Sequence, residues 1–162
     1  MTPAFNPADI LLLLPEVAIT LTGLLVLALD FSLPGRSRGW LAGLSLVGIG
    51  ASLALVCQQA STGSRVVVFS GLHVVDLYAA FFKLVFLVSA AIVILLAIHF
   101  VREQGAPEGE FYALILFATL GTMLMASAAD LLSLFVGLET LSICTYVLCG
   151  YLKKDQRCNE GA

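Results

Sequence analysis

The chain has 162 residues, of which 60% are hydrophobic and only 12% charged, and its mean hydropathy is +1.03. These values lie far outside the range of soluble domains and indicate a membrane protein. The net charge of −3 rests on few groups, and most of the 8 lysine and arginine residues fall in short polar breaks between apolar runs. The sequence therefore offers no basic surface for nucleic acid, which is excluded as a partner.

Five apolar stretches are each long enough to cross a hydrocarbon core about 30 Å thick, which takes about 20 helical residues. Polar segments with glycine, proline or charge separate most of them, and Asp130 is a predicted N-cap for the last one. The sequence predicts an all-α, polytopic bundle in a single membrane domain over residues 1–162. The predicted helices cover residues 10–29, 40–57, 77–101, 111–127 and 131–151.

The basic residues in the breaks orient this bundle through the positive-inside rule. With the N-terminus outside, only Arg65 falls on the outer side, and the other six basic loop residues fall on the cytoplasmic side. Those six are Arg36, Arg38, Arg102, Lys153, Lys154 and Arg157. The predicted topology therefore has the N-terminus outside and the C-terminus inside.

Small residues recur at helical spacing in two of the predicted spans. Such residues let membrane helices approach closely, so both spans are predicted to pack tightly against other helices. The second span carries Gly39, Gly43 and Ala51, with Gly48 and Ser52 alongside, and the fourth carries Ala118, Thr122 and Ala126.

Three charged side chains lie inside the predicted spans. Glu139 lies about 12 Å from the outer end of its helix, and Lys83 and Glu16 each lie about 9 Å from theirs. A charge at a helix centre costs about 2.5 to 3.5 kcal/mol on insertion scales, so such residues usually face protein or water and mark a transport path. Glu16 follows Pro15, and both residue types are also typical of an ordinary first helical turn.

Glu139 is the strongest candidate for a catalytic group, with proton transfer as its role. Apolar surroundings favour a neutral carboxyl and a nearby ammonium favours the carboxylate, so the group can bind or release a proton as its partner moves. Ser142, Thr145 and Tyr146 share roughly one helix face with it and could extend a hydrogen-bonded route. Alternatively, Glu139 is a protonated acid bonded to a neighbouring helix, and the hydroxyls bond back to their own helix.

Lys83 has two interpretations that the sequence leaves open. A lysine near a helix end commonly extends to the membrane interface, where Asp76 on the same helix face could meet it. Lys83 is also the candidate partner of Glu139 across the interface of the third and fifth helices. His73 and His99 lie near the membrane boundaries and are interpreted as ordinary interfacial residues.

The four cysteines show no CxxC spacing and no paired histidine, so no metal site or redox motif is predicted. Cys57, Cys144 and Cys149 lie within or at the ends of apolar runs. They are interpreted as small buried apolar residues.

The run "EFYALILFATLGTMLMASAADLLSLFVGLETLSICTYVLCGYLKKDQRCNEGA", residues 110–162, closely resembles subunit N of the proton-pumping NADH-quinone oxidoreductases, respiratory complex I. The motifs "LLPE" at 13–16 and "FFK" at 81–83 extend the similarity over nearly the whole chain. Related cation/proton antiporter subunits share the general pattern, but the wording of "EFYALILFATLG" and "MASAADLLSLFVGLETLS" favours subunit N.

The resemblance implies that Glu139 is a proton-transfer residue whose lysine partner lies on a later helix. It implies a role in proton translocation coupled to quinone reduction, with other membrane subunits of complex I and the lipid bilayer as partners. It also implies that NADH, FMN, iron–sulfur clusters and quinone bind elsewhere in the complex, so this chain is expected to hold no cofactor and no metal. A multi-pass location in a bacterial inner membrane, with a periplasmic N-terminus, follows from orientation and resemblance together.

Members of this family continue through many more helices, whereas this sequence ends at "CNEGA" where a sixth would begin. Transport paths lie at the interface of inverted repeats, so a five-helix piece alone is expected to be inactive. The chain is accordingly interpreted as an N-terminal portion of the subunit. The alternatives are a structural or assembly element of the membrane, and a subunit of a related cation/proton antiporter.

Overall fold

The computed structural model describes residues 9–32, 39–63, 65–104 and 108–151. A short helix α1 (Asp9–Leu12) leads into α2 (Leu14–Ser32), which is followed by α3 (Gly39–Thr62). Strand β1 (Val66–Val68), the 3₁₀ turn η1 (Phe69–Gly71) and strand β2 (His73–Val75) then precede α4 (Leu77–Gln104), α5 (Glu108–Ala126) and α6 (Leu131–Cys149). Within this part of the chain, five helices are long and apolar enough to cross a membrane, which confirms the predicted polytopic bundle.

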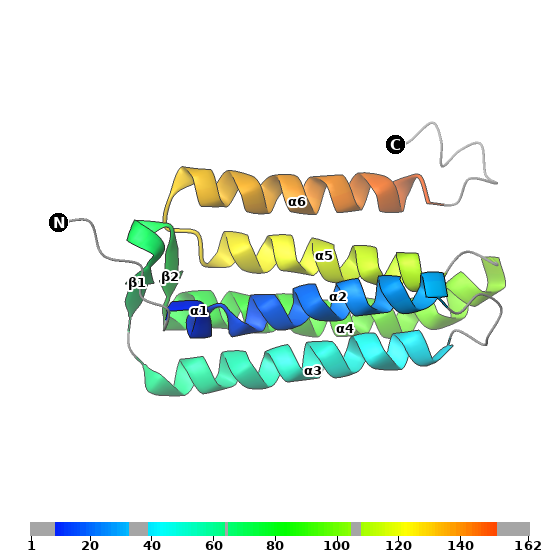
Figure 1. Cartoon of the computed structure of the whole chain (residues 1–162), viewed down its shortest axis with the longest axis horizontal. Helices are drawn as coiled ribbons and strands as arrows, with labels where there is room; N and C mark the ends of the chain where they lie inside the picture. Colours follow the sequence, from blue (N-terminus) through cyan, green and yellow to red (C-terminus); the bar gives the residue numbers. More distant parts are fainter. Residues whose placement is uncertain (1–8, 33–38, 64, 105–107, 152–162) are drawn as a thin grey trace.

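The long helices lie side by side along the long axis of the molecule (Figure 1). Helix α5 packs against α2, α4 and α6, whereas α6 packs mainly against α5. In Figure 1, α3 and α6 lie on opposite sides of the bundle. One long face of α6 is therefore left uncovered by the described part of the chain.

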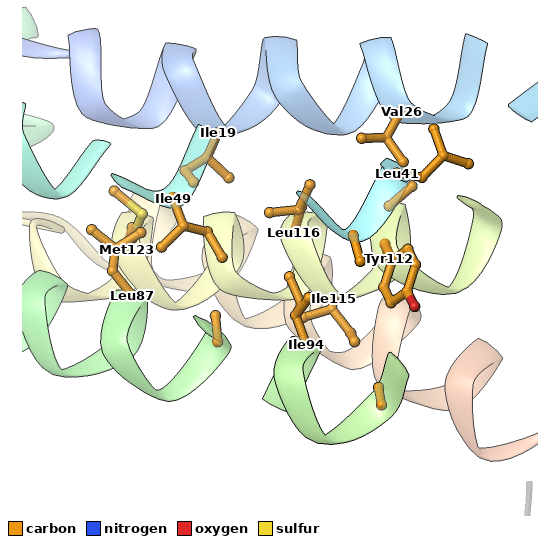
Figure 2. Close-up of a cluster of buried hydrophobic side chains, with 14 of the residues drawn as sticks. Ile19, Val26, Leu41, Ile49, Leu87, Ile94, Tyr112, Ile115, Leu116 and Met123 are labelled. Carbon is orange, nitrogen blue, oxygen red and sulfur yellow. The ribbon is translucent and has the colours of Figure 1, made fainter. Parts of the chain in front are cut away.

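The hydrophobic core lies between α2, α3, α4 and α5. Figure 2 shows side chains from all four helices meeting there, including Ile19, Ile49, Leu87 and Leu116, each at most 1% exposed. In α6, only Gly137 and Cys144 are buried. Because burial of apolar side chains drops so sharply at α6, this helix is attached to the bundle by a narrow stripe rather than by the core.

Close helix packing occurs at Gly48 of α3, which the small-residue pattern included, and at Gly121 of α5, which it did not. Gly43 has open space around its Cα and Ala51 is exposed, whereas Gly48 lies against the Thr22 side chain of α2. A methyl group on Gly121 of α5 would lie 2.7 Å from the backbone nitrogen of Leu141 in α6. The prediction of tight packing holds for α3 at Gly48, while the expected row at positions 39, 43 and 51 is wrong because positions 43 and 51 face away from the neighbouring helices.

A two-stranded hairpin, which is not among the predicted elements, covers one end of the bundle (Figure 1). Strands β1 and β2 are antiparallel, with Val66 opposite Val75 and Val68 opposite His73. Two backbone hydrogen bonds attach the hairpin to the α5–α6 connection: Val74 N donates to Ser127 O over 2.9 Å, and Ala129 N donates to Leu72 O over 3.1 Å. The hairpin is thus fixed against the α5–α6 connection, and β2 also contacts α4.

Candidate functional site

A buried ion pair joins α2 to α4 at the hairpin end of the bundle. Lys83 Nζ lies 2.5 Å from Glu16 Oε1, and Lys83 and Glu16 are only 1% and 3% exposed. Glu16 stands in the first turn of α2, next to Pro15, as the sequence predicts. Lys83 is in the second turn of α4, so the two helix ends bring the charges to the same depth.

Lys83 does not take the interfacial position that a lysine near a helix end commonly adopts. Its side chain is buried, and Asp76 instead accepts a hydrogen bond of 2.7 Å from Ala79 N, capping the start of α4. The ion pair that Lys83 forms in the described chain is with Glu16 and not with Glu139. Sequence reasoning missed this pairing because Glu16 alone reads as a normal first-turn acid.

His73 completes the cluster from the hairpin. Its Nε2 lies 3.9 Å from Glu16 Oε1, and the residue is 7% exposed, so the expectation of an ordinary interfacial histidine is wrong. Burial lowers the pKa of His73 from 6.5 to about 4; the Glu16 carboxylate partly opposes this, and the Lys83 ammonium adds to it. His99 is 84% exposed at its side chain and pairs with Glu103 at 3.0 Å.

Two polar atoms of the cluster have no hydrogen-bond partner among the residues that the structure describes. These are Glu16 Oε2 and His73 Nε2; Glu16 Oε1 likewise has no assigned hydrogen bond, but it forms the ion pair with Lys83, and all three atoms are buried. Buried polar atoms are nearly always hydrogen-bonded, and those that are not commonly mark functional positions. The cluster therefore combines three titratable groups with unused hydrogen-bonding capacity.

Helix α3 holds the start of α2 in place. Ser52 Oγ donates to Pro15 O over 3.0 Å, and Gln59 Nε2 donates to Leu12 O over 2.8 Å. These bonds satisfy backbone carbonyls at the α1–α2 junction, where the proline interrupts regular helix bonding. The backbone that carries Glu16 is consequently fixed by side chains from a neighbouring helix.

Glu139 lies apart from this cluster, near the middle of α6. Its side chain is exposed on the surface of the described chain, and the described residues provide it with no ion pair or side-chain hydrogen bond. Thr145 Oγ1 donates to Leu141 O over 3.0 Å and to Ser142 O over 2.9 Å, so this hydroxyl bonds back to its own helix. A carboxylate on the uncovered face of a membrane helix requires further protein or water against it.

An open cleft of about 610 Å³ lies between α4, α5 and α6. Apolar and small side chains line most of it, with Phe82, Phe86 and Leu141 among them, and Arg65 and Asp76 lie at its hairpin end. Neither Glu139 nor the three residues of the buried cluster line this cleft. The cleft and the two carboxylates are thus separate features of the bundle.

The cysteines and the acidic residues show no arrangement for a metal. Within the described ranges, no group of three or more His, Cys, Asp or Glu residues could hold a metal ion. Cys144 is buried as expected, but Cys57 and Cys149 are exposed on the outer surface of the bundle, so the expectation of burial is wrong for these two.

No family model matches the chain. Individual proteins of known name are similar to nearly the whole of this chain. The chain is 43% identical over 163 residues to NADH-quinone oxidoreductase subunit N 1 of Koribacter versatilis, covering 96% of this chain and 32% of the relative. It is 39% identical to NADH-quinone oxidoreductase subunit N of Trichlorobacter lovleyi, with the same coverage. Subunit N 1 of Solibacter usitatus is 38% identical over 100% of the chain and 33% of its own length. The chain thus spans about a third of the length of these relatives.

Proposed function

We propose that this chain, which is homologous along nearly its whole length to about a third of NADH-quinone oxidoreductase subunit N, is an N-terminal portion of such a subunit. In this role it takes part in proton translocation coupled to quinone reduction, and Glu139 transfers protons. Its partners are the other membrane subunits of the complex. NADH, FMN, iron–sulfur clusters and quinone bind elsewhere in that complex, and the five-helix portion alone is inactive.

The position of Glu139 carries this proposal. The residue lies about 12 Å along a helix that is long enough to cross a membrane, on the face that the described chain leaves uncovered. A bare carboxylate there would be costly against lipid, so the remaining two thirds of a subunit of the relatives' length would have to cover it. The lysine partner that the resemblance implies would belong to that part.

Lys83 is not the direct proton partner of Glu139 in this proposal. Because its ammonium is held by Glu16, it influences Glu139 only through the packing of α4, α5 and α6 and not as a direct proton partner. The proposed location is a bacterial inner membrane, with the hairpin end periplasmic. This orientation leaves Arg65 as the single basic loop residue on the periplasmic side. Of the other basic loop residues, the structure describes only the backbone of Arg102.

The test is Glu139→Gln in the full-length subunit within its assembled complex. We expect NADH-driven proton uptake into membrane vesicles to lose most of its rate, while NADH oxidation by the peripheral part and the yield of assembled complex stay within twofold. Glu103→Gln is the matched control, because Glu103 is an exposed carboxylate at the far end of α4. It should leave pumping unchanged.

Three outcomes contradict the proposal in different ways. Unchanged pumping removes Glu139 from the proton path. Failed assembly with normal coupling in the remaining complex favours the structural role. Transport that depends on sodium or potassium, without an attached quinone reductase, favours the related antiporter.

A further inference from the structure

We infer that Glu16, Lys83 and His73 form a second proton-binding site, separate from Glu139, in which His73 takes up the proton at the hairpin end of the bundle. The three side chains come from α2, α4 and β2, and each is at least nine-tenths buried. Ionisable groups held inside a membrane bundle commonly serve proton transfer, because their burial is otherwise unfavourable. This inference goes beyond the proposed function, which rests on Glu139 alone.

The cluster can bind one additional proton, because its three side chains together carry no net charge before binding. With Lys83 as ammonium, Glu16 as carboxylate and His73 neutral, the net charge of the cluster is zero. A proton from water at the hairpin end can bind to His73, and the carboxylate then lies between two cations. The imidazolium donates from both ring nitrogens, and Glu16 Oε2 is an acceptor without another partner in the described chain. Proton uptake forms one N–H bond on His73 and breaks one O–H bond of a hydronium ion, and release to water reverses both changes.

Glu16 and Lys83 are the charged groups that act on His73 in addition to its burial. Helix α3 contributes no charged residue, and the acidic residues of α5 stand in its first turn, at the opposite end of the bundle. Asp76 and Arg65 belong to the hairpin side and line the cleft next to α4, and Asp130 is exposed at the start of α6. Besides burial, the groups that change the proton affinity of His73 are thus the Glu16 carboxylate and the Lys83 ammonium.

The ion pair and the histidine are therefore coupled. Burial and the Lys83 ammonium both lower the pKa of His73, whereas the Glu16 carboxylate raises it. Any movement that takes the Lys83 ammonium away from the cluster makes His73 a stronger base. Movement that takes the Glu16 carboxylate away has the opposite effect.

The experiment follows His73 by nuclear magnetic resonance of the imidazole in the full chain, reconstituted in lipid nanodiscs. The sequence contains 2 histidines, so a His99→Gln background leaves His73 as the only signal. Lys83→Met should raise the titration midpoint of His73 by about one pH unit or more. Glu16→Gln should lower the titration midpoint of His73 below that of the parent chain, because the carboxylate that raises it is removed.

A double variant guards against misfolding of the single ones, which each leave a buried charge unpaired. Glu16→Gln with Lys83→Met removes both charges, and its midpoint should fall between those of the two single variants. Glu103→Gln changes an exposed carboxylate far from the cluster and should leave the midpoint in place. Equal titration midpoints of His73 in all well-folded variants would overturn the inference. A His73 midpoint equal to that of an exposed imidazole would overturn it as well. Because no other subunit is needed, this result is independent of whether Glu139→Gln affects pumping.

Discussion

Lys83 Nζ of α4 lies 2.5 Å from Glu16 Oε1 of α2, and this contact places an ammonium and a carboxylate together where neither reaches the surface of the described chain. Removing water from two charges is costly, and the mutual attraction offsets that cost only while both partners remain. The pair therefore stabilises the association of α2 with α4 only while both charged side chains are present. Removing one of the two charges should therefore destabilise the fold more than removing both.

The first prediction concerns the stability of this pair. Glu16→Gln or Lys83→Met alone should lower the free energy of unfolding by about 3 to 5 kcal/mol, because each leaves an uncompensated buried charge. The double variant should be less destabilised than the sum of the two. Reversible unfolding of the full chain by sodium dodecyl sulfate in mixed micelles measures all three. Additive losses would show that the two side chains do not interact.

The second prediction concerns pH. Because the pKa of His73 is lowered from 6.5 to about 4 in the folded chain, the unfolded chain binds a proton below pH 6.5 that the folded chain does not bind until about pH 4. Stability should therefore be fully present above pH 6.5 and fall towards pH 4, by up to about 1.4 kcal/mol per pH unit from this residue. His73→Gln should remove that part of the slope, measured by the same unfolding at a series of pH values. His99→Gln is the control, and an identical pH dependence in the wild type and His73→Gln would contradict the prediction.

The third prediction concerns the attachment of α6. Gly121→Ala should destabilise the chain by about 1 to 3 kcal/mol, because the new methyl group would meet the backbone of α6, 2.8 Å from Gly137 O. Gly43→Ala is the matched control, since no atom lies within 4 Å of the position of its methyl group. It should be neutral or slightly stabilising, because alanine favours a helix over glycine. Equal stability of the two variants would show that α6 does not pack closely at Gly121.

The fourth prediction concerns the junction between the hairpin and α4. Asp76→Ala removes the acceptor for Ala79 N, a bond of 2.7 Å, and should cost about 1 kcal/mol. Asp76→Asn keeps a side-chain acceptor and should recover most of this loss. Amide hydrogen exchange at Ala79 reports the change locally. Unchanged exchange there in Asp76→Ala would mean that the cap does not protect the first turn of α4.

The hairpin shows why part of the candidate site was missed. The runs Val66–Val68 and His73–Val75 are rich in β-branched residues and enclose a short turn, a pattern that favours paired strands. The turn itself is less evident, because Phe69 and Ser70 both adopt positive φ values, of 53° and 58°, which such residues rarely do. Without the hairpin, His73 reads as a loop residue at the membrane boundary and its approach to Glu16 cannot be foreseen.

The sequence by itself determined the class of the protein and the identity of its unusual charges. Span length and apolarity are local properties of a chain in lipid, so five helices and an intramembrane Glu139, Lys83 and Glu16 could be predicted from residue order alone. Partner choice depends on which helices meet and how each is rotated, and only the tertiary structure decided it. Because α2 and α4 both pack against α3 and α5, their side chains Glu16 and Lys83 meet near the hairpin, whereas α6 packs mainly against α5 and leaves Glu139 on an uncovered face.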